Sequence, residues 1–225
     1  IITTKDLDAY LQGKPCSNRT RHNIRGSILR LWSWAKSKDR IPGRAATVAE
    51  ATSAYKVERA KSPGIFTPED FAHILGQADD EWVPYFVIGA FAGLRHAEIQ
   101  RLTWEDIRID EKVIILGSDI TKTNKRRVAH MPDNLVEWLT HSKVDKEGAV
   151  CPGTRPNKAT LRAAKLAKIP WVKNGLRHSY ISYQMAILRD AGKVAEQCGN
   201  CASEVQESYK ANALIREAEK WFKIR

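Results

Sequence analysis

The chain has 225 residues, 43% of them hydrophobic, which is enough for one well-packed core and a smaller helical module. Lys and Arg number 37 against 26 Asp and Glu, and the formal net charge is +11. This balance predicts a polyanionic partner, and favours nucleic acid over an anionic membrane surface. No apolar stretch approaches the roughly 20 residues that cross a bilayer, so we expect no membrane partner and a cytoplasmic, nucleoid-associated protein.

The four cysteines predict neither a disulfide framework nor a metal site. Only Cys198 and Cys201 form a CxxC pair, and Cys16 and Cys151 stand alone. A zinc site needs two further Cys or His ligands at comparable spacing, which the neighbouring sequence does not supply. We expect reduced structural thiols and no bound metal.

The first part of the chain predicts two helices. A short one follows Thr4 and ends at Gly13, and a longer one starts after Ser17. The longer helix has apolar residues at helical spacing: Ile24, Ile28, Leu31 and Ala35. Four arginines fall largely elsewhere on the cylinder: Arg19, Arg21, Arg25 and Arg30. This basic side is either a solvated face or a surface that contacts DNA phosphates, and the pattern supports the two interpretations equally.

A change of pattern divides the chain into two domains. From about Asp39 to Ser62 the helical periodicity is lost, and prolines and glycines interrupt the sequence. We therefore predict a small helical domain over 1–45, a linker over 46–64 and a larger domain over 65–225.

The larger domain opens with strong helix signals. Thr67 and Pro68 fit the N-cap and first position of a helix, and the apolar run 82–92 predicts a buried one. Gly93 then ends that helix, and a further helix begins near Arg95. An arginine is thus expected at a rigid junction.

One small sheet is expected among the helices. The segments 113–116 and 128–131 flank a polar turn and predict antiparallel strands. The remaining predicted helices cover 133–140, 157–167, 175–189, a short stretch near Lys193, the stretch around Tyr209 and the C-terminal end. The fold class predicted is mainly α with a small antiparallel β-sheet, in which the larger domain is α+β.

Four segments carry reactive residues in a fixed order. The first two are Ala92-Gly-Leu-Arg-His-Ala-Glu-Ile99, with Arg95 and Glu98, and the strand-turn segment 120–128 with Lys122. The third is Asn174-Gly-Leu-Arg-His178, with Arg177. The fourth is Cys198-Gly-Asn200, with Tyr209 nine residues later. This order resembles that of the tyrosine recombinase (phage integrase) family. Several motifs in the correct order and spacing are much less often matched by chance than any single motif.

The resemblance extends from about Thr4 to Arg225 and implies a partial core-binding domain, lacking its first helices, followed by a catalytic domain. It implies that Tyr209 attacks a DNA phosphate and forms a 3′-phosphotyrosyl bond, with no metal or nucleotide cofactor. Arg95 and Arg177 would hold the phosphate, and Lys122 would protonate the leaving oxygen. Glu98 would orient Arg95. The implied activity is site-specific integration or excision of a mobile element.

Two positions depart from the family pattern. Asn174 stands where the family has histidine, and Asn200 where it has histidine or tryptophan. An amide can donate a hydrogen bond to a phosphate, but it carries no charge and accepts no proton near neutral pH. The chain is therefore either a weakened recombinase or a recombinase-like DNA-binding protein without activity. His178 is either a packed helix residue or a proton-transfer group. An RNA-binding protein is a third class, for which the sequence offers no stacking-aromatic signature.

Double-stranded DNA is the partner that these features predict. The expected phosphate contacts are Arg19, Arg21, Arg25, Arg30, Lys125, Arg126 and Arg127. The last helix has an apolar face: Leu214, Ala218, Trp221 and Phe222. The family resemblance implies that this face docks on a neighbouring protomer on DNA, and the alternative is that it folds back on its own domain.

Overall fold

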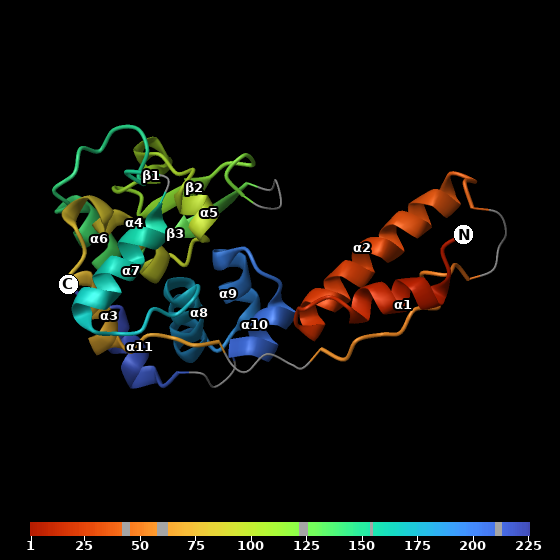
Figure 1. The fold of residues 1–225 in the computed structure, drawn as a ribbon. Coiled ribbons are helices and arrows are strands. Elements are labelled where there is room, and N and C mark those ends of the chain that lie inside the picture. Colours follow the sequence, from red (N-terminus) through yellow and green to blue (C-terminus); the bar gives the residue numbers. More distant parts are fainter. Residues whose placement is uncertain (42–45, 58–62, 122–125, 154, 210–212) are drawn as a thin grey trace. The chain divides into compact units, whose positions relative to one another are not determined.

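The computed structural model describes residues 1–41, 46–57, 63–121, 126–153, 155–209 and 213–225. The chain separates into two compact units, Ile1–Lys61 and Ser62–Arg225 (Figure 1). The division falls within the stretch 46–64, in which we expected the linker. None of the helices in the described ranges is both long and apolar enough to cross a membrane.

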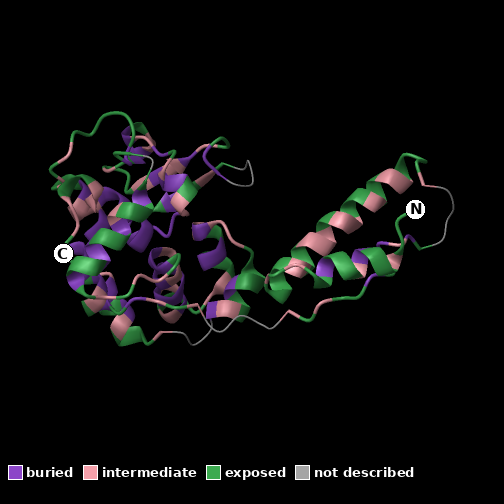
Figure 2. Cartoon of the chain, in the orientation of Figure 1, coloured by how far each residue is buried: buried purple, intermediate pink, exposed green. Residues whose placement is uncertain are grey.

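The smaller unit consists of two capped helices and a returning segment. Thr3 caps α1 (Thr4–Gln12), and Ser17 caps α2 (Asn18–Ser37) by accepting hydrogen bonds from backbone N–H groups in the first turn. α2 buries none of its residues, so its predicted apolar side is only partly covered (Figure 2). Part of the stretch predicted as linker packs back here, because Thr47, Ala49 and Thr52 are buried.

The larger unit is mainly helical, as predicted. Its helices are α3 (Pro68–Leu75), α4 (Val83–Phe91), α5 (His96–Ile99), α6 (Asp133–Thr140), α7 (Pro156–Ala167), α8 (Gly175–Leu188), α9 (Ala191–Cys198), α10 (Ala202–Tyr209) and α11 (Ile215–Trp221). Two 3₁₀ turns, Asp80–Trp82 and Trp104–Asp106, connect some of them. The fold class predicted from the sequence is confirmed.

A small antiparallel sheet accompanies the helices. Its strands, in the order β1-β2-β3, are β1 (Ile107–Arg108), β2 (Val113–Leu116) and β3 (Arg127–His130). Ile114 of β2 pairs with Ala129 of β3, and both are buried. β1 was not predicted, because two residues are too few to show an alternating pattern.

The core of the larger unit is built around α4, which is buried along almost its whole length (Figure 2). α8 packs on it, and α11 packs on α8 and α3. Trp221 of α11 stacks on Phe71 with 4.8 Å between ring centroids, and its indole Nε1 donates to the Ala90 carbonyl at 3.0 Å.

This packing matches the second of the two expectations for the C-terminal face, that it folds back on its own domain. Ala218 and Trp221 are fully buried within the larger unit of the isolated chain. Phe222 is partly buried, whereas Leu214 is 59% exposed. A large indole with a carbonyl partner for its N–H gains more from the local aromatic cluster than from solvent exposure.

Candidate active site

Two glycine turns hold two arginines that line a pocket in the larger unit. Gly93 ends the α4 segment and Gly199 caps α9, both with φ of +65°. A side chain at Gly93 would collide with the ring of Tyr180, so the close approach needs glycine. The Gly93 carbonyl accepts from Arg177 Nη1, and the Gly199 carbonyl accepts from Arg95 Nη2. Each turn thus supplies a backbone acceptor for one guanidinium.

Glu98 fixes Arg95 at the start of α5. Glu98 Oε2 accepts from the backbone N–H of Arg95 at 2.8 Å, and Oε1 accepts from Arg95 Nη1 at 3.0 Å. Glu98 itself is only 1% exposed. The orienting role that the resemblance implied therefore has a geometric basis.

Arg127 of β3 holds the same carboxylate from the other side. Its Nη1 and Nη2 donate to Glu98 Oε1 and Oε2, each at 3.0 Å. Burial raises the pKa of Glu98, but the hydrogen bonds from Arg127 and Arg95 outweigh it, and the net shift is downward. We expected Arg127 to contact DNA; instead, its side chain is 13% exposed and both terminal nitrogens bind Glu98.

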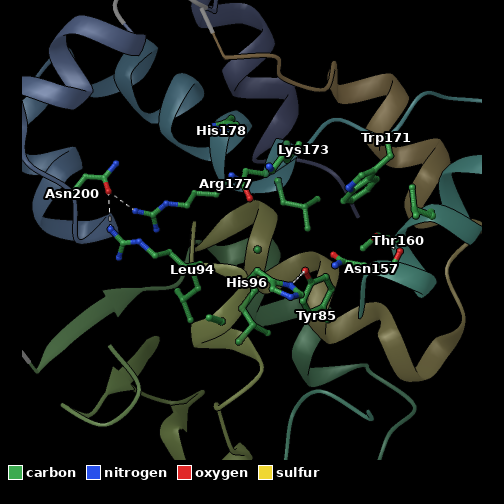
Figure 3. A pocket seen from close by; sticks show the side chains of 18 of the residues that line it. Tyr85, Leu94, His96, Asn157, Thr160, Trp171, Lys173, Arg177, His178 and Asn200 are labelled. Atoms are coloured by element: carbon green, nitrogen blue, oxygen red, sulfur yellow. Dashed lines mark hydrogen bonds between the residues drawn. The ribbon is translucent and has the colours of Figure 1, made fainter. Parts of the chain in front are cut away.

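Asn200 joins the two candidate phosphate-binding arginines. Its Oδ1 accepts from Arg95 Nη2 at 2.8 Å and from Arg177 Nη2 at 2.9 Å. Figure 3 shows the Asn200 oxygen facing Arg177 and a second guanidinium, with a dashed line to each. Arg177 Nη2 also donates to the Cys198 carbonyl at 2.7 Å. The guanidiniums are thus held side by side by the turn that follows α9.

Tyr209 and His178 form a hydrogen-bonded pair. Tyr209 Oη lies 2.7 Å from His178 Nδ1, and Tyr209 is 4% exposed. Burial raises the pKa of Tyr209 to about 12, against the opposing charge of Arg177. Burial and the neighbouring Arg177 lower the pKa of His178. At neutral pH both groups are therefore uncharged, and the phenol donates to Nδ1 in the tautomer of His178 that has its proton on Nε2.

Six residues of the predicted site line one pocket of about 820 Å³. Its lining includes Arg95, Arg177, Asn174, Asn200, His178 and Tyr209. Asn174 occupies the position before α8 with φ of +55°, a left-handed conformation that asparagine tolerates better than most residues. Helix geometry thus gives one reason for asparagine there.

The pocket also contains residues that sequence reasoning missed. His96 Nδ1 lies 2.8 Å from the Tyr85 hydroxyl, and Trp171 and Lys173 also line the pocket (Figure 3). His96 and Lys173 each neighbour a motif residue in sequence, which was an available signal. Tyr85 and Trp171 carried none, since both resemble core aromatics.

Other predicted residues are dispersed. Lys122 and Lys125 lie outside the described residues, and Arg126 is exposed. In the smaller unit, Arg19 and Arg30 are exposed. Two arginines there have structural partners: Arg21 donates to the Lys14 carbonyl, and Arg25 to the hydroxyl and carbonyl of Thr52, all at 2.9 Å.

The cysteines are free thiols, and the buried Cys198 donates to the Val194 carbonyl at 2.9 Å. Over the described part of the chain, no group of three or more His, Cys, Asp or Glu side chains is placed to hold a metal ion.

Comparison with known proteins bears on this constellation. Residues 85–186 match the phage integrase family. The larger unit contains a phage integrase family domain. The resemblance drawn from the motifs is confirmed to that extent, and the matched range of this integrase domain includes Arg95, Glu98, Arg127 and Arg177. A search of curated proteins gave no match.

Solved structures of similar fold extend beyond the matched range. The Tn1549 transposon integrase, in complex with a circular intermediate DNA, has a TM-score of 0.71 at 16% identity, covering 99% of this chain and 85% of that one. A lambda integrase dimer bound to a COC′ core site has a TM-score of 0.68 at 16% identity, covering 88% and 79%. The integrase from mycobacterium phage Brujita has a TM-score of 0.55 at 18% identity, covering 100% and 79%. These similarities show that the integrase fold continues through α10 and α11.

Proposed function

We propose that this chain is a site-specific DNA recombinase that cleaves and rejoins DNA through a phosphotyrosyl intermediate, for integration or excision of a mobile element. The observation that carries the proposal is the Tyr209–His178 hydrogen bond of 2.7 Å in the pocket that also holds the paired guanidiniums of Arg95 and Arg177. A nucleophile, an acceptor for its proton and two anchored cations are the groups that phosphodiester cleavage needs.

In the proposed reaction, Tyr209 Oη attacks the phosphorus while His178 Nδ1 takes the phenolic proton. The bond from Tyr209 to phosphorus forms and the bond from phosphorus to the 5′ oxygen breaks. Arg95 and Arg177 stabilise the charge on the non-bridging oxygens with planar forks. Lys122 supplies the proton to the 5′ oxygen, an assignment that rests on the family resemblance. Attack by a 5′ hydroxyl on the phosphotyrosine reverses these steps, so rejoining needs no ATP.

The two asparagines limit the rate of this chemistry. Neither amide can transfer a proton near neutral pH, and loss of one acid–base group typically costs about 100- to 10,000-fold. His178 supplies the proton acceptor for Tyr209 in this scheme. We therefore propose a slow enzyme. The second candidate is a recombinase-like DNA-binding protein without activity, which the burial of Tyr209 and the asparagine at position 200 favour.

We propose double-stranded DNA as the partner of both units, in the nucleoid. The exposed Arg19 and Arg30 of α2, and Arg126 beside β3, suit phosphate contacts. Lambda integrase forms a dimer on a core site and a tetramer on a Holliday junction. We extend such assembly on DNA to this chain, with Leu214 as the exposed apolar residue of the C-terminal segment.

Covalent capture tests the proposal. A library of nicked duplexes with randomised sequence is incubated with the protein, and linked DNA is separated on a denaturing gel and sequenced. The wild type should give a DNA-linked band that Tyr209→Phe loses. Tyr180→Phe is the matched control, because it removes a buried hydroxyl whose hydrogen bond goes to Gln197 at 3.1 Å. No band from the wild type, with DNA binding intact, would favour the non-catalytic candidate.

A further inference from the structure

Residues at the end of α9 and in the turn after it accept hydrogen bonds from the Nη2 nitrogens of both Arg95 and Arg177. A guanidinium Nη group carries two N–H donors. Arg95 Nη2 donates to the Gly199 carbonyl and to Asn200 Oδ1. Arg177 Nη2 donates to the Cys198 carbonyl and to Asn200 Oδ1. Both donors of each Nη2 group are therefore engaged by this turn.

The Asn200 oxygen differs from the two carbonyls because both guanidiniums share it. Its distances to the two Nη2 nitrogens, 2.8 and 2.9 Å, are those of a phosphate oxygen held by two arginines. Guanidinium groups only donate, so the amide atom in this position is the oxygen. A second oxygen acceptor cannot enter the same position while the amide remains there.

We propose that Asn200 Oδ1 is a built-in substitute for a phosphate oxygen, so that a phosphate enters the arginine pair only when the Asn200 side chain rotates away. This inference rests on the proposed function in one respect, that the arginine pair receives a phosphate. The amide is neutral, whereas a phosphate is an anion and adds Coulombic attraction to both guanidiniums. A phosphate can therefore displace the amide, at the cost of the two bonds that it breaks.

The side chain can leave without the backbone. The Cys198 and Gly199 carbonyls are fixed by the end of α9 and by the positive φ of Gly199, whereas Asn200 Oδ1 moves by rotation about side-chain bonds. The residue at position 200 thus sets how readily the arginine pair accepts an oxyanion. A charged acceptor at position 200 would stay bound to the arginine pair and exclude a phosphate, and a side chain without an acceptor would leave the pair free to bind one.

The test is the affinity of the full chain for inorganic phosphate, measured by calorimetry at constant pH and ionic strength. Asn200→Leu keeps the approximate shape and removes the acceptor. We expect it to bind phosphate about tenfold more tightly, because the competing bonds are gone. Asn200→Asp adds a charge to the acceptor and should bind at least about tenfold more weakly. Asn23→Leu on α2, an exposed residue of the smaller unit, should match the wild type.

Weaker phosphate binding by Asn200→Leu would overturn the inference, because Asn200 would then be needed to orient the arginines. Absence of binding in every form would overturn it too. Asn200→Ala guards against misfolding of the leucine variant and should also tighten binding. All forms can be measured in a Tyr209→Phe background. Failure of covalent capture with tightened phosphate binding would reject the cleavage chemistry while leaving the role of Asn200 standing.

Discussion

The arginines of α2 and those around the pocket are the same residue type in opposite settings. On α2, Arg30 is exposed and donates to Ser27 Oγ one turn away at 3.0 Å. In the pocket, Arg95 and Arg177 each bind acceptors from separate elements of the larger unit. An exposed arginine can follow a polyanion at a salt-dependent gain in affinity, whereas an anchored one is already placed for developing charge. We therefore expect the exposed arginines to affect DNA affinity and the anchored arginines to affect the rate of the reaction.

The largest effect is expected from substitution of Glu98, whose carboxylate binds Arg95 and Arg127. Glu98→Ala leaves Arg95 and Arg127 without their shared counter-charge, which should reduce the free energy of unfolding by about 3–5 kcal/mol. Chemical denaturation measures it. Glu69→Ala is the control: Glu69 is 63% exposed and pairs with Lys220, so its loss should lower the free energy of unfolding far less than the loss of Glu98. Equal losses in both variants would remove the distinction between anchored and exposed pairs.

The same carboxylate predicts an acid limb of stability. The pKa of Glu98 is lowered in the folded state, so the folded protein takes up this proton less readily than the unfolded chain. The contribution of the ionised Glu98 side chain to the free energy of unfolding is complete above the ordinary glutamate pKa of about 4.3. It is lost as pH falls through the lower pKa of the folded state. Glu98→Gln should flatten this part of the profile in urea midpoints taken from neutral to acid pH. An unchanged acid limb would assign the effect to other carboxylates.

Much of this arrangement could be predicted from sequence. The motif spacing indicated that Arg95, Arg177 and Tyr209 belong together, and the structure places them in one pocket. The role of Arg127 could not be foreseen, because its neighbours 120–128 are strongly basic and its pairing with Glu98 depends on how β3 lies against α5. Trp221 was equally ambiguous, since an apolar helical face looks alike whether it meets its own core or a partner.

Arg177→Lys tests whether the anchored arginine of the pocket matters for the rate of the reaction more than an exposed arginine of α2 does. Lysine keeps the charge but loses the fork that reaches Gly93, Cys198 and Asn200. We expect the single-turnover rate of covalent adduct formation on a captured nicked duplex to fall by about 100-fold or more. Arg30→Lys on α2 should stay within about twofold. Similar rates for both variants would show that the anchoring of Arg177 is irrelevant to the reaction.

His178→Gln tests the proton acceptor. The pKa of His178 is lowered by burial and by Arg177, so the wild-type rate should be at its plateau at neutral pH and decline only as pH falls through that lowered value. Glutamine cannot take the phenolic proton, so adduct formation should fall by about 100-fold and lose this acid limb. A pH–rate profile of both proteins measures it. An acid limb that persists in the variant would point to another group.

The smallest effect is expected from substitution of the exposed arginines of α2. Substitution of Arg19 and Arg30 by alanine should weaken DNA binding. The negative slope of log affinity against log salt should become shallower by about 0.9 for each DNA phosphate that the variant no longer neutralises. The rate of adduct formation on saturating DNA should not change, because neither residue belongs to the pocket. A slower rate at saturation would contradict the division between affinity and chemistry.

The most direct test of the central claim is to locate the protein–DNA bond. The adduct formed on a nicked duplex is digested with nuclease and protease, and the modified peptide is sequenced by mass spectrometry. We expect a nucleotide remnant on the hydroxyl of Tyr209, joined through its 3′ phosphate. A remnant on any other residue, or the absence of an adduct from protein that binds the same DNA, would contradict the account.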